Sequence, residues 1–97
     1  MITLKTIKET LGKNKSLLAE KYQVKKIGVF GSYVRNEQKA KSDIDVLVEF
    51  KEPIGMFEFM DLEGFLRRLL GVKVDLVSKK ALKPVIGRYI LKETVYI

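Results

Sequence analysis

Residues 29–50 constrain this chain more than any other stretch, because a Gly-Ser step and an acidic alternation follow one another there. The first apolar run is rich in residues that favour strands. It ends at Gly31, where the missing Cβ lets backbone approach a ligand closely, and Ser32 follows. A second run begins with Asp43 and Asp45, and the period of two along a strand places both carboxylates on one face. The stretch predicts two strands, with a turn for a phosphate and two acids pointing the same way.

The paired acids indicate a site for a hard cation. Magnesium prefers oxygen ligands and usually binds through one or two carboxylates plus substrate phosphates. A third acid, Asp75, lies in another run of strand type and would converge with Asp43 and Asp45 from a neighbouring strand. Three such acids can hold two metal ions about 3.5–4 Å apart, for in-line displacement on a triphosphate. Gly31 and Ser32 would then bind phosphate oxygens through backbone N–H groups and the hydroxyl, where a helix begins.

The Gly-Ser step, the Asp-x-Asp pair after ten intervening residues and the later strand acid Asp75 resemble the nucleotidyltransferase fold of the DNA polymerase beta superfamily. From about residue 25 to the end, the chain looks like a minimal nucleotidyltransferase (MNT). One departure is Asn36, where many relatives have Gly. Because Asn tolerates left-handed backbone, the turn is still expected. The resemblance implies an α/β (α+β) domain, with helices packed on a small mixed β-sheet.

The resemblance also implies an activity. It implies a magnesium-dependent nucleotidyltransferase that moves AMP from ATP to a hydroxyl group and releases pyrophosphate. Asp43 and Asp45 would bind both metal ions, and Asp75 would help to activate the acceptor oxygen as ligand or base. Stand-alone MNT proteins are frequently encoded beside a HEPN-domain ribonuclease toxin and act as its antitoxin, in some cases by transferring AMP to a tyrosine. ATP and a HEPN toxin, in a hetero-oligomer, are therefore the expected partners.

Two other functions remain open. A binding antitoxin would keep the fold and block the toxin sterically, with its acids serving stability or nucleotide sensing. An adenylyltransferase for small hydroxyl compounds would use the same chemistry. The second is less favoured, because those relatives carry an extra domain for the acceptor.

The site residues also have purely structural explanations. Gly31 and Ser32 could form only a strand-to-helix turn. The Asp43 and Asp45 pair could be the solvent face of an edge strand. Asp75 could share such a face with the lysine two residues earlier. The three acids and the Gly-Ser step in family order favour the site.

Two further residues are assigned to nucleotide binding with alternatives. Arg35 would neutralise a triphosphate or the leaving pyrophosphate, which a planar guanidinium does well. It could instead form a salt bridge to Glu37 or to an acid of the second strand. Ser42 would cap or steer the acidic strand.

Composition excludes several other classes of protein. With no cysteine and no histidine, the chain has neither a disulfide framework nor a thiolate or imidazole metal site. Ninety-seven residues predict one domain, residues 1–97, with a modest core. No stretch reaches the ~20 apolar residues of a membrane span, so no membrane association and a cytoplasmic location are expected. The net charge of +7 could attract ATP, RNA or an acidic protein. Its lysines are dispersed, however, so direct nucleic-acid binding is not expected.

Hydrophobic spacing predicts alternating helices and strands. The expected helices are 3–22, 32–36, 54–70 and a last one starting near Pro84, and the expected strands are 26–30, 44–50 and 73–77. Residues 37–42 form a polar loop. The apolar stripe of 54–70 is assigned to the core, with Phe57, Phe59 or Phe65 as possible partner contacts. The inward face of the last helix is expected to comprise Val85, Ile86, Tyr89, Ile90 and Val95.

Overall fold

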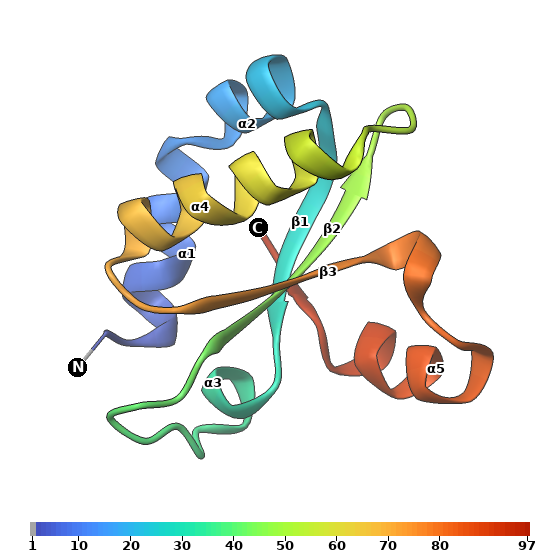
Figure 1. Cartoon of the computed structure of the whole chain (residues 1–97). Helices are drawn as coiled ribbons and strands as arrows, with labels where there is room; N and C mark the ends of the chain where they lie inside the picture. The colour runs from blue at the N-terminus through green and yellow to red at the C-terminus, as the bar shows by residue number, and fades with distance from the viewer. Residues whose placement is uncertain (1) are drawn as a thin grey trace.

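The computed structural model describes residues 2–97, in which a four-stranded sheet carries the helices (Figure 1). The helices are α1 (Leu4–Lys13), α2 (Lys15–Tyr22), α3 (Ser32–Arg35), α4 (Met56–Leu70), the 3-10 turn η1 (Lys79–Ala81) and α5 (Pro84–Glu93). The strands are β1 (Val24–Phe30), β2 (Ile44–Phe50), β3 (Val74–Ser78) and β4 (Val95–Tyr96). Their order is β3-β2-β1-β4, with β2 and β3 parallel and the other pairs antiparallel. The predicted mixed sheet with packed helices is confirmed.

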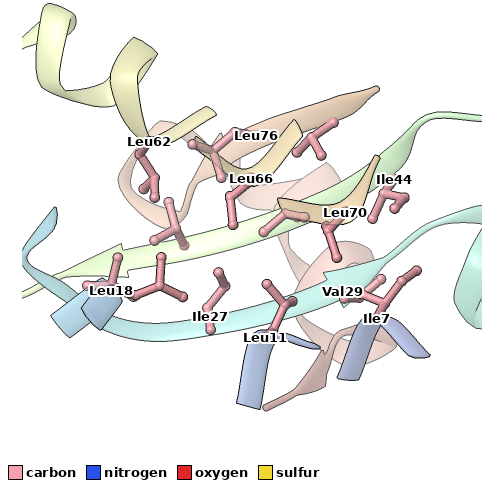
Figure 2. Packing of buried hydrophobic residues seen from close by; sticks show 14 of the residues in the cluster. Ile7, Leu11, Leu18, Ile27, Val29, Ile44, Leu62, Leu66, Leu70 and Leu76 are labelled. Atoms are coloured by element: carbon pink, nitrogen blue, oxygen red, sulfur yellow. The ribbon is translucent and has the colours of Figure 1, made fainter. Parts of the chain in front are cut away.

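Alternation along the strands separates the two faces of the sheet. In β2, the alternating side chains of Ile44, Val46 and Val48 are fully buried in the core, where helices α1, α2 and α4 cover one face (Figures 1 and 2). The helices contribute apolar side chains that repeat every three or four residues. Those that are buried are Ile7, Leu11, Leu18, Leu62, Leu66 and Leu70. Asp45 and Asp75 occupy the alternate positions of β2 and β3, so they lie on the face opposite these helices.

The first helix predicted from the sequence is two helices. Asn14 separates α1 from α2, with φ −105° and ψ 9°. Its side-chain amide donates a hydrogen bond to the carbonyl of Thr10, and its N–H bonds back to Leu11. This local hydrogen bonding competes with continuation of the helix, as is typical of Asn. Gly12, two residues earlier, lies inside α1 and does not interrupt it.

The end of the chain is a strand and not the predicted continuation of the last helix. Helix α5 ends at Glu93, and Thr94 has extended backbone (φ −61°, ψ 129°). β4 then pairs with β1 at Gly28 and Val29. A Cβ at Gly28 would lie 3.0 Å from the carbonyl oxygen of Val95, so glycine permits this close pairing. The prediction was wrong because a strand of two residues is too short to show the alternation of apolar and polar side chains that identifies strands in a sequence.

Two predicted apolar faces are corrected by the structure. In α4 the C-terminal half is core, and Phe59 and Phe65 pack against it. Exposed apolar residues at its start are Met56, Phe57 and Met60. The predicted inward face of α5 is largely outward, since the exposed side chains are Val85, Ile86 and Tyr89. The reason is that α5 lies apart from α1, α2 and α4, so its apolar stripe has no helix layer to pack against (Figure 1).

Remaining differences are at element boundaries. β1 begins two residues earlier than predicted, β3 is shifted by one residue, and α4 starts at Met56. Pro84 occupies the first turn of α5, as predicted. No helix within residues 2–97 has the length and apolarity needed to cross a membrane.

Candidate active site

Strand pairing brings two of the three predicted acids together. Asp45 of β2 and Asp75 of β3 are direct partners across the parallel ladder. Asp43 lies two residues before Asp45, immediately ahead of β2, so the strand period gives it the same face. Asp43 and Asp45 are half-buried, and Asp75 is exposed. The acids therefore line an open face of the sheet at which a large molecule can approach.

The surroundings of Asp45 disfavour its ionised form. Partial burial, together with the nearby charges of Asp75 and Asp43, raises the pKa of Asp45 to about 6. Arg35 offsets this only in part. A carboxylate held against two like charges gains from a nearby cation, because the cation favours its ionised form.

This donor set fits magnesium without being a complete cage. Within residues 2–97, no three acidic, histidine or cysteine side chains form a ready-made metal cluster. Magnesium does not require one, since it commonly takes one or two carboxylates and completes its shell with waters and substrate phosphates. Asp43 and Asp45, with Asp75 on the adjacent strand, supply such oxygens. The three acids therefore fit the magnesium ion that the family resemblance implies.

Gly31 sits directly against the acids. The preceding residue, Phe30, pairs with Asp45 across the antiparallel β1–β2 ladder, which places the turn at Gly31 beside that carboxylate. Gly31 has φ 81° and ψ −151°, a conformation reserved for glycine. A Cβ there would come within 2.9 Å of the Asp45 carboxyl carbon. The glycine thus leaves room for the acid and exposes backbone to the same space.

The short helix α3 follows this turn at Ser32. The carbonyl of Gly31 accepts hydrogen bonds from the N–H groups of Val34 and Arg35, which starts the helix. At its other end Asn36 adopts the predicted left-handed conformation, with φ 58°. Amide groups at the start of a helix lack acceptors within it, so the N–H of Ser32 needs an acceptor from outside α3.

Ser42 organises the loop that leads to the acidic strand. Its hydroxyl accepts a hydrogen bond from the N–H of Lys39 at 2.8 Å, and its own N–H donates to the Lys39 carbonyl at 3.0 Å. The Tyr33 hydroxyl donates to the Ser42 carbonyl at 3.4 Å. These contacts hold the backbone that precedes Asp43, and a role of Ser42 in nucleotide binding stays a prediction.

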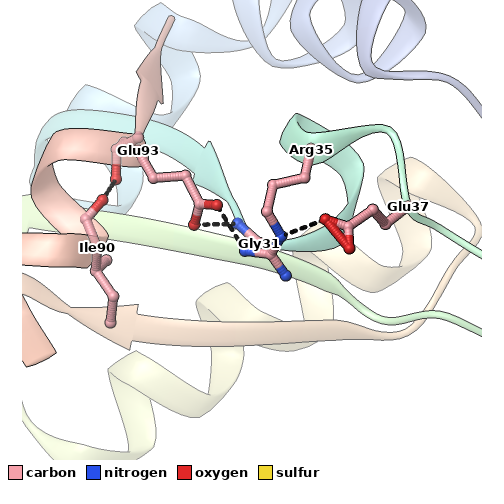
Figure 3. A network of polar contacts seen from close by, with 6 residues as sticks. Gly31, Arg35, Glu37, Ile90 and Glu93 are labelled. Carbon is pink, nitrogen blue, oxygen red and sulfur yellow. Dashed lines mark hydrogen bonds and ion pairs between the residues drawn. The ribbon is translucent and has the colours of Figure 1, made fainter.

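Arg35 is held by two carboxylates, one of which the sequence did not reveal. It contacts Glu37 (Nε···Oε1, 3.0 Å), as one of its predicted alternatives required, and also Glu93 of α5 (Nη1···Oε1, 2.6 Å). The other oxygen of Glu93 accepts a hydrogen bond from the Gly31 N–H at 3.0 Å (Figure 3). Glu93 thus ties the last helix to both the Gly31 turn and α3.

The charge state of Glu93 reflects these contacts. Partial burial raises its pKa, but the hydrogen bonds from Arg35 and Gly31 outweigh this and leave the pKa below its ordinary value. The hydrogen bond and the negative charge of Glu93 in turn raise the pKa of Arg35. One signal in the sequence could have found Glu93. A carboxylate in the last turn of a helix lies at the negative end of the helix dipole, so it needs a partner outside the helix.

A cavity of about 640 Å³ opens between this turn and α5. One wall has the polar groups of the site, and the other has side chains from a single face of α5. The lining residues are Phe30, Gly31, Arg35, Asp45, Ile86, Tyr89, Ile90, Lys92 and Glu93. Its volume lies within the range of about 300–1,000 Å³ typical of small-molecule sites.

Replacing Asp45 with asparagine should stabilise the metal-free protein in a pH-dependent way. The folded-state pKa of about 6 lies above the ordinary value of 3.8, so folding binds a proton. The associated stability is fully present below pH 4 and is lost as the pH rises through about 6. Solvent screens this half-exposed group, so we expect a gain of about 1 kcal/mol at pH 7.5, or roughly 4–8 °C in Tm. Thermal melts in EDTA from pH 4 to 8 measure it. Asp61→Asn on α4 is the control, and a gain equal at all pH values would contradict the assignment.

Removing Glu93 should destabilise the fold more than removing Glu37, although both carboxylates pair with Arg35. The Glu93 side chain is 23% exposed and Glu37 is 62% exposed. Glu93→Ala also leaves the part-buried Gly31 N–H without its acceptor, which costs about 1–3 kcal/mol. Glu37→Ala removes only a surface ion pair, worth about 0–1 kcal/mol. Urea denaturation compares the two, and equal losses would show that Glu93 adds nothing beyond a surface charge.

Comparison with known proteins agrees with this geometry. The Nucleotidyltransferase domain family matches residues 8–97. Protein adenylyltransferase MntA of Thermococcus cleftensis is 47% identical, over 100% of this chain and 98% of that protein. A solved structure described as a candidate minimal nucleotidyltransferase aligns with TM-score 0.83 and 34% identity, over 97% of this chain and 95% of that one. A chain in a toxin–antitoxin structure with AMP-PNP aligns with TM-score 0.73 and 26% identity, over 88% and 69% of the two chains.

These matches confirm the family resemblance and the nucleotidyltransferase class of enzyme that the acids and the Gly-Ser step predicted. The family match spans every site residue discussed above, from Gly31 to Glu93. The chain therefore belongs to the nucleotidyltransferase domain family, as one of its minimal nucleotidyltransferases.

Proposed function

We propose that this protein transfers AMP from ATP to a hydroxyl group of a HEPN-type ribonuclease toxin, as the antitoxin of that toxin. The observation that carries the proposal is the pairing of Asp45 with Asp75 on adjacent strands beside the Gly31 turn. This pairing, beside the backbone of Gly31, supports a site for a metal–triphosphate complex. A tyrosine of the toxin is the proposed acceptor, and the two proteins would form a hetero-oligomer.

Each site residue has a role in this reaction. Asp43 and Asp45 would hold magnesium, with Asp75 as a further ligand or as the base. When bound, the metal would neutralise the phosphates and polarise the reacting oxygens. Ser32 would donate hydrogen bonds to phosphate oxygens from its N–H and hydroxyl. Arg35, held near Asp45 by Glu93, would contribute positive charge facing the leaving pyrophosphate.

The transfer is an in-line displacement. The acceptor hydroxyl oxygen forms a bond to the α-phosphorus of ATP, while the bond from that phosphorus to the oxygen bridging the β-phosphate breaks. Pyrophosphate leaves with the electron pair of that bond. The hydroxyl proton passes to the Asp75 carboxylate and then to solvent. Asp75 is the most exposed of the three acids, so it is the one that a hydroxyl on a large partner reaches first.

Two relatives support a macromolecular acceptor. One is named a protein adenylyltransferase and has nearly the same length as this chain. The other belongs to a toxin–antitoxin structure with an ATP analogue, AMP-PNP. The open face around Asp45 and Asp75 suits an acceptor that brings its own shape, because Asp75 is exposed and does not line the cavity.

Intact-mass measurement of the cognate HEPN protein tests the proposal. The toxin is incubated with this protein, ATP and magnesium, and parallel samples contain EDTA or lack ATP. Additions of one or more AMP units only in the complete mixture are expected, and peptide mapping then identifies the modified residue. A stable complex with no added mass would overturn transfer and favour neutralisation by binding alone. Addition to a serine would overturn the tyrosine assignment only.

A further inference from the structure

We propose that the apolar wall of the 640 Å³ cavity, formed by Ile86 and Tyr89 of α5, is the subsite for the base of a purine nucleotide. This inference rests on the proposed function, because it places the triphosphate at the opposite, polar wall. The base subsite would determine which nucleotides bind, and Ile86 and Tyr89 would be the residues that select them.

The arrangement of α5 supplies a flat surface on one side of the cavity. Ile86, Tyr89 and Ile90 are spaced i, i+3 and i+4, so they form one stripe of the helix. The tyrosine side chain is 75% exposed and Ile86 is 59% exposed. An aromatic ring beside an aliphatic side chain, both facing an open cavity, offers a platform on which a base can stack.

The opposite wall fixes the orientation of the ligand. Gly31, Arg35 and Asp45 line the same cavity, so phosphates bound there leave the rest of a nucleotide facing α5. Lys92 adds a second cation to the lining, whereas Glu93 is already matched by Arg35. The polar groups at Gly31, Arg35 and Asp45 and the apolar stripe of α5 therefore line one cavity, which matches the two ends of a nucleoside triphosphate.

The chemistry of the apolar wall determines its selectivity. Isoleucine side chains and the face of a tyrosine ring offer no hydrogen-bond pattern for reading the edge of a base. Stacking strength then depends mainly on the size of the π-system, which is larger in purines than in pyrimidines. The wall should therefore prefer ATP and GTP over CTP and UTP, with little distinction between the two purines.

Calorimetric binding to the full chain with magnesium and no partner tests this subsite. The ligands are ATP, UTP and inorganic triphosphate, and the proteins are wild type, Tyr89→Ala, Tyr89→Phe and Val85→Ala. Val85 is the matched control because it is exposed on the same helix but does not line the cavity. Tyr89→Ala should weaken ATP binding about tenfold and leave triphosphate binding unchanged. Tyr89→Phe and Val85→Ala should stay within about twofold of wild type, and wild type should prefer ATP to UTP.

The outcomes separate this inference from the proposed function. Equal weakening of ATP and triphosphate by Tyr89→Ala, or no weakening of either, would overturn the subsite while leaving AMP transfer intact. Tyr89→Ala that binds ATP normally but no longer binds the toxin would assign the α5 wall to the protein partner instead. Failure of the wild-type chain to bind ATP would overturn both proposals.

Discussion

The double variant Asp43→Ala, Asp45→Ala should lose AMP transfer by at least about 10³-fold. Both carboxylates are proposed to hold the metal, which supplies several kcal/mol of transition-state stabilisation, and each 1.4 kcal/mol is tenfold in rate. The fold should survive, because the substitutions remove the partly buried charge of Asp45 and its repulsion by Asp43, and burial and repulsion both raise the pKa of Asp45. Intact mass of the toxin over time measures transfer, and a thermal melt confirms folding.

A matched control removes two acids that lie away from the site. Glu49 lies on β2 and is 3.8 Å from Lys79, and Asp61 is exposed on α4. Glu49→Ala combined with Asp61→Ala should transfer AMP at a rate within about threefold of wild type, because surface charges away from the site contribute little. Residual transfer by the Asp43/Asp45 variant above one-tenth of the wild-type rate would rule out its carboxylates as metal ligands.

The same variant separates catalysis from occlusion in cells that express the toxin. If transfer neutralises the toxin, the Asp43/Asp45 variant should fail to protect growth, although it still binds the toxin. Protection equal to wild type, with no AMP on the toxin, would instead establish a binding antitoxin.

Gly31→Ala should abolish transfer and also destabilise the protein. Alanine is strained at φ 81° and ψ −151°, which costs about 1–3 kcal/mol, and its Cβ would press on the Asp45 carboxyl group. We expect a loss of at least about 2 kcal/mol in the free energy of unfolding, or roughly 10 °C in Tm for a domain of this size. Transfer should fall at least about 100-fold even at temperatures where the variant is folded, since the acid and the turn cannot both keep their positions.

Gly12→Ala is the control for this substitution. Gly12 lies inside α1, is exposed, and has its nearest neighbour for an added Cβ at 3.8 Å. Alanine there should raise stability by about 0.5–1 kcal/mol through helix propensity and leave transfer unchanged. If Gly31→Ala were as stable and as active as Gly12→Ala, the close approach of this turn to Asp45 would have no functional role.

Local patterns in the sequence determined the central strands and the position of their acids. The alternation from Asp43 to Val48 gave the bounds of β2, and the Val-Lys-Val-Asp run gave β3 within one residue. Because the side-chain period of a strand is two, that alternation also decided which residues face the core and that the acids face away from it. Neighbouring parallel strands then place Asp45 beside Asp75, which the sequence predicted without fixing the register.

The C-terminal part was decided by tertiary structure. Nothing periodic marks β4, whose pairing depends on the space beside Gly28. The apolar stripe of α5 has helical spacing whether it faces a core or a cavity, so Tyr89 was assigned inward although it is exposed. The contact of Glu93 with Gly31 and Arg35 joins residues 62 and 58 positions apart. Sequence periodicity reports only which side chains share a face of one element, whereas such contacts depend on where the completed sheet and its helices come to lie.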